Sequence, residues 1–298
     1  EAAGSPVALV AEMNKNLPWL GHHAAIEADR FDVLLDQPSS DYPLFSAPQM
    51  SVSPEDHMIG FYASTLLKDG GTLQVGIGSL GAALVHSAIL RHSHNDAWRK
   101  VFDHLNVDQK FPVVREDGGS GPFEKGLYGC SEMMVDGFLY LMQEGILSRE
   151  VYDHAGLQSL LNRGDISEEV SLATLDVLRR EKLIDSPLRA KDVHWLARHG
   201  IFRDSVEFKG GRLRVGDQSV EGDLDNPEAR EAIETLILGE RLTGGIAMHG
   251  GFYVGPEQFY QYLREMNDEQ RAKICMTSVH FINHLYDHPF GDQKLKAA

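Results

Sequence analysis

The spacing of hydrophobic residues along this chain alternates between short apolar runs and helical stripes. Apolar runs bounded by Gly, Pro or Asn predict strands, and apolar residues at every third or fourth position predict helices packed on one side. These patterns predict strands over 7–13, 31–35 and 72–75, and helices over 54–66, 80–90 and 133–144. Strands that alternate with helices indicate an α/β fold, with an open, mainly parallel sheet flanked by helices.

The same patterns divide the first half of the chain. The stretch between residues 37 and 54 is rich in Pro, Ser and Asp and has little periodicity, which is typical of a connector. We therefore expect residues 1–50 to be the end of a preceding domain with its connector. Residues 51–150 are expected to form the first part of the α/β domain. The region from residue 106 to residue 121 ends in EDGGSGP, which is typical of a flexible loop.

The pattern changes beyond Gly145. Two helices at 172–184 and 191–199, followed by a hairpin at 206–215, predict an inserted α+β module over 151–242. The order helix, helix, hairpin is also typical of a winged DNA-binding module. However, many acids lie on or beside these helices and would repel phosphates, so we interpret the insertion as a structural or contact module.

The last part, 243–298, is expected to continue the α/β domain to a truncated end. Residues 244–255 are rich in glycine and predict a flexible run, and Pro256 predicts the start of a helix. Residues 274–286 predict a strand that passes into a helix.

Composition narrows the class of protein. The 298 residues carry a net charge of −16, which argues against nucleic-acid binding because such binding relies on phosphate neutralisation by Lys and Arg. No window approaches the run of about 20 apolar residues that a membrane span needs. Cys130 and Cys275 are too few for a disulfide framework, so we expect reduced thiols and a cytoplasmic location.

A glycine-rich turn joins the strand at 72–75 to the following helix. Gly76-Ile77-Gly78-Ser79-Leu80-Gly81 matches the G-x-G-x-x-G spacing, which places bare backbone at a helix N-terminus where a phosphate or carbonyl oxygen can bind. A nicotinamide site also needs a strand ending in an acid about 20 residues further on. The chain there is polar and helical in pattern, with Asp96. An NAD-dependent oxidoreductase and a purely structural turn remain as alternatives.

Glu132 is the acid that we single out. It stands where the helix over 133–144 is predicted to begin, three residues after Gly129. The positive end of a helix favours an ionised carboxylate. Such a carboxylate can act as a nucleophile, whereas the simpler interpretation is a helix cap. His249, between glycines, is either a ligand contact or a solvated side chain. The histidines lack the helical i, i+4 pairing with an acid typical of zinc, so we expect no metal site.

Several motifs together carry a family resemblance. DGGTLQVGIGSLGAALV, GCSEMMVDGFLYLMQEGIL, MHGGFYVGPEQFYQYLR and KICMTSVHFIN occur in that order, and VALVAEMNKNLPWLGHHAAIEADRFDVLL precedes them. Outside about 151–242, the chain resembles the acetyl-CoA hydrolase/transferase family of class I coenzyme A transferases. The segment that precedes the four motifs, over residues 7–35, is similar to the one that joins the two halves of proteins in that family.

The resemblance implies a function and a site. It makes Glu132, in the E-x-x-x-D-G segment, the nucleophile that forms a glutamyl-CoA thioester, and Gly76, Ile77, Gly78, Ser79 and Leu80 the coenzyme A site. Further substrate or oxyanion contacts are expected at Gly129, His249, Gly250 and Gly251. The expected activity is that of an acyl-CoA transferase or acetyl-CoA hydrolase on a short-chain acyl-CoA. Coenzyme A is then a substrate rather than a resident cofactor, and the second substrate is a carboxylate. A homodimer is possible under this resemblance.

Two departures from the family accompany this resemblance. The usual H-T-E is here Cys130-Ser131-Glu132. The family continues past this C-terminus into a G-x-G-G loop that helps hold the coenzyme and the oxyanion. We therefore expect the chain to be a fragment of a longer-chain member, with little turnover by itself. A non-catalytic ligand-binding module remains as another alternative.

Overall fold

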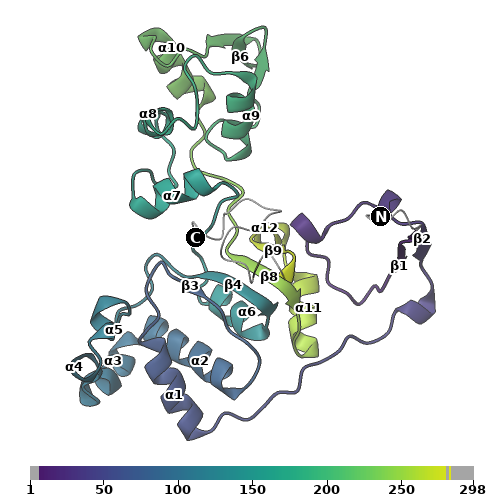
Figure 1. Ribbon diagram of the computed structural model, residues 1–298, viewed down its shortest axis with the longest axis vertical. Helices are drawn as coiled ribbons and strands as arrows, with labels where there is room; N and C mark the ends of the chain where they lie inside the picture. The colour runs from purple at the N-terminus through teal and green to yellow at the C-terminus, as the bar shows by residue number, and fades with distance from the viewer. Residues whose placement is uncertain (1–6, 280–281, 283–298) are drawn as a thin grey trace. The chain divides into compact units, whose positions relative to one another are not determined.

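Within the described residues, a sheet of four parallel strands lies in the first of two units into which the chain divides (Figure 1). The computed structural model describes residues 7–279 and 282. The first unit runs to Glu150 and resumes at Ile246, and the second comprises Val151–Gly245.

The strand order in this sheet is β3–β4–β8–β9. The strands are β3 (Thr72–Leu73), β4 (Tyr128–Met134), β8 (Met248–Tyr253) and β9 (Ile274–Met276). In register, Cys130 on β4 pairs with His249 on β8, which pairs with Cys275 on β9. Because all neighbours are parallel, the carboxyl ends of the strands lie along one edge, which is where open α/β sheets bind ligands.

Helices flank this sheet. They are α1 (Pro54–Ser64), α2 (Ser79–Ser93), α3 (Asn95–His104), α4 (Val107–Lys110), α5 (Val113–Glu116), α6 (Asp136–Gln143), α11 (Glu257–Glu265) and α12 (Asp268–Ala272). Apolar side chains of α2, α6 and α11 share one core with the strands, with Val85, Phe138 and Phe259 among its members. The expected α/β fold, with a parallel sheet flanked by helices, is confirmed.

The segment before α1 is far more exposed than its sequence predicts. Its strands β1 (Val10–Glu12) and β2 (Val33–Leu35) form a two-stranded parallel sheet. We expected the apolar run over 7–13 to form a buried strand, but Val10 in this run is 57% exposed. Trp19 and Phe45, later in the same segment, are 66% and 74% exposed. An apolar run indicates a strand that can be buried, whereas burial itself requires a covering layer.

The second unit combines helices with an antiparallel sheet. Its elements are α7 (Ala155–Arg163), α8 (Leu172–Arg180), α9 (Ala190–Arg198), β5 (Glu207–Lys209), β6 (Arg212–Val215), β7 (Gln218–Glu221), α10 (Pro227–Ala232) and a π-helical turn (Ile233–Ile237). The predicted hairpin is present as β5 and β6, and β7 adds a third strand to it. Leu175, Leu196 and Ile237 are among the side chains of a separate apolar core.

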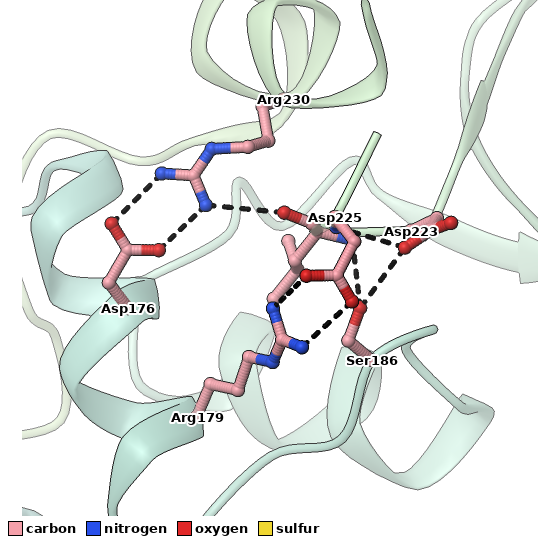
Figure 2. A network of polar contacts seen from close by, with 7 residues as sticks. Asp176, Arg179, Ser186, Asp223, Asp225 and Arg230 are labelled. Atoms are coloured by element: carbon pink, nitrogen blue, oxygen red, sulfur yellow. Dashed lines mark hydrogen bonds and ion pairs between the residues drawn. The ribbon is translucent and has the colours of Figure 1, made fainter. Parts of the chain in front are cut away.

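Paired charges tie α8 to helix α10 and to the segment that precedes it (Figure 2). The two guanidinium nitrogens of Arg179 lie 2.6 and 2.7 Å from the carboxylate oxygens of Asp225. Those of Arg230 lie 2.6 and 2.9 Å from Asp176. Many of the acids that we noted in this module therefore have arginine partners within it.

Two local predictions are wrong. Glu132 lies inside strand β4 rather than at the start of a helix, and helix α6 begins four residues later at Asp136. Residues 244–255 contain strand β8 instead of a flexible run. Most of β4 is buried on both faces and has no polar/apolar alternation, so its end resembled the first turn of the helix that follows it.

Two other predictions are settled only in part. Strand β9 is present, whereas most of the helix expected to follow it falls on 280–281 and 283–286, outside the described residues. In the part of the chain that the structure describes, no helix has the length and apolar character needed to cross a bilayer.

Candidate ligand-binding site

A cavity of about 390 Å³ opens at the carboxyl edge of the sheet. Its lining comes from the ends of the three adjacent strands β3, β4 and β8, from helices α2 and α6, and from the connector before α1. The lining residues are Ala47, Pro48, Gln49, Met50, Val75, Gly76, Ile77, Gly78, Gly81, Ala82, Val85, His86, Ile89, Val135, Asp136, Gly137, Tyr140, Val254, Gly255 and Pro256. This volume lies in the range of small-molecule sites, about 300–1,000 Å³.

The glycine turn forms part of this cavity. Gly76, Ile77 and Gly78 line it, while Ser79 and Leu80 are the first two residues of helix α2. Gly78 has φ +117°, a conformation that side-chain-bearing residues rarely adopt. At Gly81 a side chain would overlap the carbonyl oxygen of Gly76, so this glycine lets the helix pack closely against the turn.

Three helices begin at the cavity. The N-cap residues of α2, α6 and α11 are Gly78, Val135 and Pro256, and none of them provides a side-chain acceptor for the helix. In α6, the Asp136 carboxylate accepts a hydrogen bond from the Gly137 N–H at 3.0 Å. Exposed N–H groups and the helix macrodipole favour a ligand oxygen that carries negative charge.

Glu132 is placed close to this edge but outside the cavity lining. It is half-buried in β4, between buried Ser131 and half-buried Met133. The Ser131 hydroxyl donates to the Val75 carbonyl at 3.1 Å, which ties β4 to the segment that enters the glycine turn. A Cβ atom at Gly251 would lie 2.9 Å from the Glu132 carbonyl oxygen, so strand β8 passes very close to this residue.

The other predicted contact residues lie in the sheet. His249 is 2% exposed, and its Nδ1 is 2.7 Å from the Tyr128 hydroxyl. A side chain at Gly129 would overlap Met248, and one at Gly250 would meet Met276 at 2.6 Å. These glycines therefore allow close packing between strands and side chains, and His249 belongs to a buried polar cluster rather than to a loop.

Tyr128 is the residue of this cluster that sequence reasoning missed. Burial raises the pKa of the Tyr128 phenol well above its ordinary value, and burial likewise raises the pKa of the Cys130 thiol to about 11. Both groups are therefore neutral near pH 7, and Cys130 lacks the thiolate needed for a nucleophile. Only the register, which sets Cys130 beside His249, reveals the cluster.

The remaining chemistry of the site is limited. Among the described residues, no group of three or more His, Cys, Asp or Glu side chains is arranged to hold a metal ion. Asp96, the acid nearest to the position that a nicotinamide site requires, lies in the first turn of helix α3 rather than at the end of a strand. Its position does not match the ribose contact of a dinucleotide site.

Comparison with known proteins yields distant structural matches only. No protein-family model matches the chain, and no curated protein matches it. RipA from Yersinia pestis is similar over 93% of this chain and 34% of its own, with 15% identity and a TM-score of 0.43. A 4-hydroxybutyrate CoA-transferase from Porphyromonas gingivalis is similar over 47% of this chain and 26% of its own, with 23% identity and a TM-score of 0.31.

The chain thus spans about a third or less of the length of these two proteins. Both TM-scores are below 0.5, so the likeness assigns no function to this chain.

Proposed function

We propose that this chain carries the nucleophile and part of the coenzyme A site of an acyl-CoA transferase or acetyl-CoA hydrolase. The observation that supports this proposal is the cavity at the carboxyl edge of the sheet, lined by the Gly76–Gly78 turn, with Glu132 on the central strand β4. The family resemblance of the same two segments points to the same chemistry.

The proposed reaction uses Glu132 as a covalent nucleophile. A carboxylate oxygen of Glu132 attacks the thioester carbonyl, the C–S bond breaks, and coenzyme A leaves as a thiolate. The products of this step are an acyl-glutamyl anhydride and the thiolate. The thiolate then attacks the glutamyl carbonyl, which releases the acyl group as a carboxylate and leaves a glutamyl-CoA thioester.

The second half of the reaction regenerates Glu132. An acceptor carboxylate that attacks the glutamyl-CoA thioester gives a new acyl-CoA by the reverse steps, whereas water gives hydrolysis. Each attack places negative charge on a carbonyl oxygen, and N–H donors in a water-poor site stabilise it. The uncapped first turn of α2 offers such donors at the cavity.

A binding experiment tests the site. Coenzyme A, acetyl-CoA and NAD are titrated against the chain by calorimetry, and against Gly76→Ala. A Cβ at Gly76 would have only the Met133 Cε as a neighbour, at 4.0 Å, so the added methyl group enters open space at the cavity without disturbing the fold. Gly121→Ala is the matched control, since its Cβ also meets nothing within 4 Å and Gly121 does not line the cavity.

We expect coenzyme A and acetyl-CoA to bind, Gly76→Ala to weaken them about tenfold or more, and Gly121→Ala to bind as the unchanged chain does. Binding of NAD without coenzyme A would overturn the proposal.

A trapping experiment tests the nucleophile. The protein is incubated with acetyl-CoA and then with borohydride, which reduces a glutamyl thioester to an alcohol, and the peptides are mapped by mass spectrometry. The mark should fall on the peptide that contains Glu132 and should be missing in Glu132→Gln. Binding of acetyl-CoA together with a mark on Asp136 or Glu144 would disprove the role of Glu132 while leaving the site in place.

A further inference from the structure

The floor of the cavity is made of valines. Val75, Val135 and Val254 follow the carboxyl ends of the adjacent strands β3, β4 and β8, and Val85 faces the same space from helix α2. These four side chains are between 4% and 8% exposed. The deepest surface that a ligand can reach is therefore apolar, and burying ligand methylene groups against it is favourable.

The rim of the cavity is less buried and carries its few polar groups. Ile77 is 54% exposed and Tyr140 is 49% exposed, whereas Asp136 is half-buried at the first turn of α6. Among the lining residues, all of which the structure describes, His86 and Asp136 are the side chains that can carry charge near pH 7, and there is no lysine or arginine. A second carboxylate buried at the floor would thus meet valines, while at the rim Asp136 adds a like charge and exposed His86 is the basic side chain of the lining.

The two ends of the cavity suit different parts of one ligand. The helix N-termini at the rim favour a single carboxylate or thioester oxygen. The valine floor favours an aliphatic chain, and desolvating a charge there has no compensating partner. The volume of about 390 Å³ is more than a two-carbon group fills.

We propose that this cavity selects aliphatic monocarboxylic acyl groups longer than acetyl, such as butyryl or hexanoyl, and rejects acyl groups that carry a second carboxylate. This inference rests on the proposed function insofar as the ligand is an acyl-CoA. The cavity and its selectivity can also be tested with free carboxylic acids, which require neither coenzyme A nor turnover.

The experiment measures free acids by NMR. Acetate, butyrate, hexanoate and succinate are titrated against the chain while the valine methyl signals and the Gly76 amide are followed. Each buried methylene group should tighten binding about threefold to fourfold, so butyrate should bind about tenfold more tightly than acetate, and hexanoate more tightly still. Succinate should bind no better than acetate.

Two variants locate the effect. Gly76→Ala should weaken hexanoate about fivefold or more, and Gly121→Ala should leave every affinity unchanged. Asp136→Asn keeps the acceptor for the Gly137 N–H while removing the charge, so it should strengthen succinate several-fold relative to butyrate.

The outcomes separate the two proposals. Chain-length dependence at the valines, together with no binding of coenzyme A, would keep the selectivity and overturn the proposed function. Binding of coenzyme A, together with equal affinities for acetate, butyrate and succinate, would support the proposed function and overturn the selectivity. Shifts confined to signals away from the valines, or no shift with any acid, would overturn the selectivity.

Discussion

The N–H groups at the helix starts of the 151–245 unit bond to side chains, whereas those of the helices at the cavity have no side-chain acceptor from the N-cap residue. In that unit, His154 Nδ1 accepts from the Leu157 N–H at the start of α7, and Asn226 accepts from the Glu228 N–H at the start of α10. The N-cap N–H groups of α8 and α9 donate to Thr174 and Asp192. At the cavity, the N-cap residues of α2, α6 and α11 offer no such acceptor.

What distinguishes the three helix ends at the cavity is a missing side-chain cap together with a space that a ligand can enter. Side-chain caps satisfy N–H groups within the protein and typically contribute about 1 kcal/mol each. A helix end without a cap, at the mouth of a cavity, leaves those donors to solvent or ligand. Helices α1 and α12 of the first unit are capped, by Ser53 with Asp56 and by Asn267, and none of these three residues lines the cavity. Helices α3, α4 and α5 lack a side-chain cap and do not line the cavity either, so a missing cap points to binding only where a cavity adjoins it.

The largest effect that we predict concerns the core behind the uncapped helices. Phe138 on α6 is fully buried in the apolar core of the sheet. Phe138→Ala should lower the free energy of unfolding by about 3–5 kcal/mol, because it removes a large apolar group and leaves a cavity. Denaturant unfolding measures the change, with Phe138→Leu as a milder control. A cost below about 1 kcal/mol would show that packing does not hold α6 in place.

An intermediate effect is expected at a capped helix. Asn226→Ala should lower stability by about 0.5–2 kcal/mol, because the Glu228 N–H loses its acceptor at the start of α10. Asn226→Ser retains a capping oxygen and should cost clearly less. Urea unfolding monitored by circular dichroism compares the two. Equal losses in both variants would assign the effect to something other than capping.

The smallest effect is expected at an ion pair of the same unit. Hydrogen bonds from Arg230 hold the pKa of Asp176 below its ordinary value. Asp176 is exposed and Arg230 is half-buried at the surface, so Asp176→Asn should cost only about 0.2–1 kcal/mol near neutral pH. A carboxyl with a lowered pKa in the folded state stabilises above its unfolded pKa and loses this contribution as the pH falls through its folded pKa.

Unfolding of the Asp176→Asn variant and of the unchanged chain should therefore differ at pH 7 and converge in acid. A difference that persists in acid, once the carboxyl is neutral in both the folded and the unfolded chain, would mean that the substitution acts through packing instead of charge.

The sequence predicted the elements with distinctive local chemistry and misjudged those without it. The helix expected over 54–66 is present as α1, which begins with a capping box of Ser53 and Asp56, and the Gly76–Gly78 turn joins β3 to α2. By contrast, β4 was interpreted as the start of a helix, because a strand buried on both faces lacks the alternation that identifies strands. Strand β8 was misjudged for a different reason, because its glycines Gly250 and Gly251 suggested flexibility but instead allow close packing.

The candidate site was predictable only in part. The glycine turn and Glu132 stand out from the sequence, and the turn does line the cavity. The valine floor was not predictable, since Val75, Val135 and Val254 are far apart in the chain and come together only through the strand order β3–β4–β8. Tyr128 and His249 likewise meet only because β4 and β8 are neighbours in register.

The sequence by itself therefore determined the α/β class, the position of the glycine turn, and Glu132 as the acid to consider. These follow from short-range chemistry: glycine conformation, helix capping and hydrophobic period act within a few residues. Only the tertiary structure decided which strand ends adjoin, that Glu132 lies in a strand, and that four valines and three uncapped helix ends surround one cavity. Strand order and register depend on pairing between residues more than 50 positions apart, which local spacing does not specify.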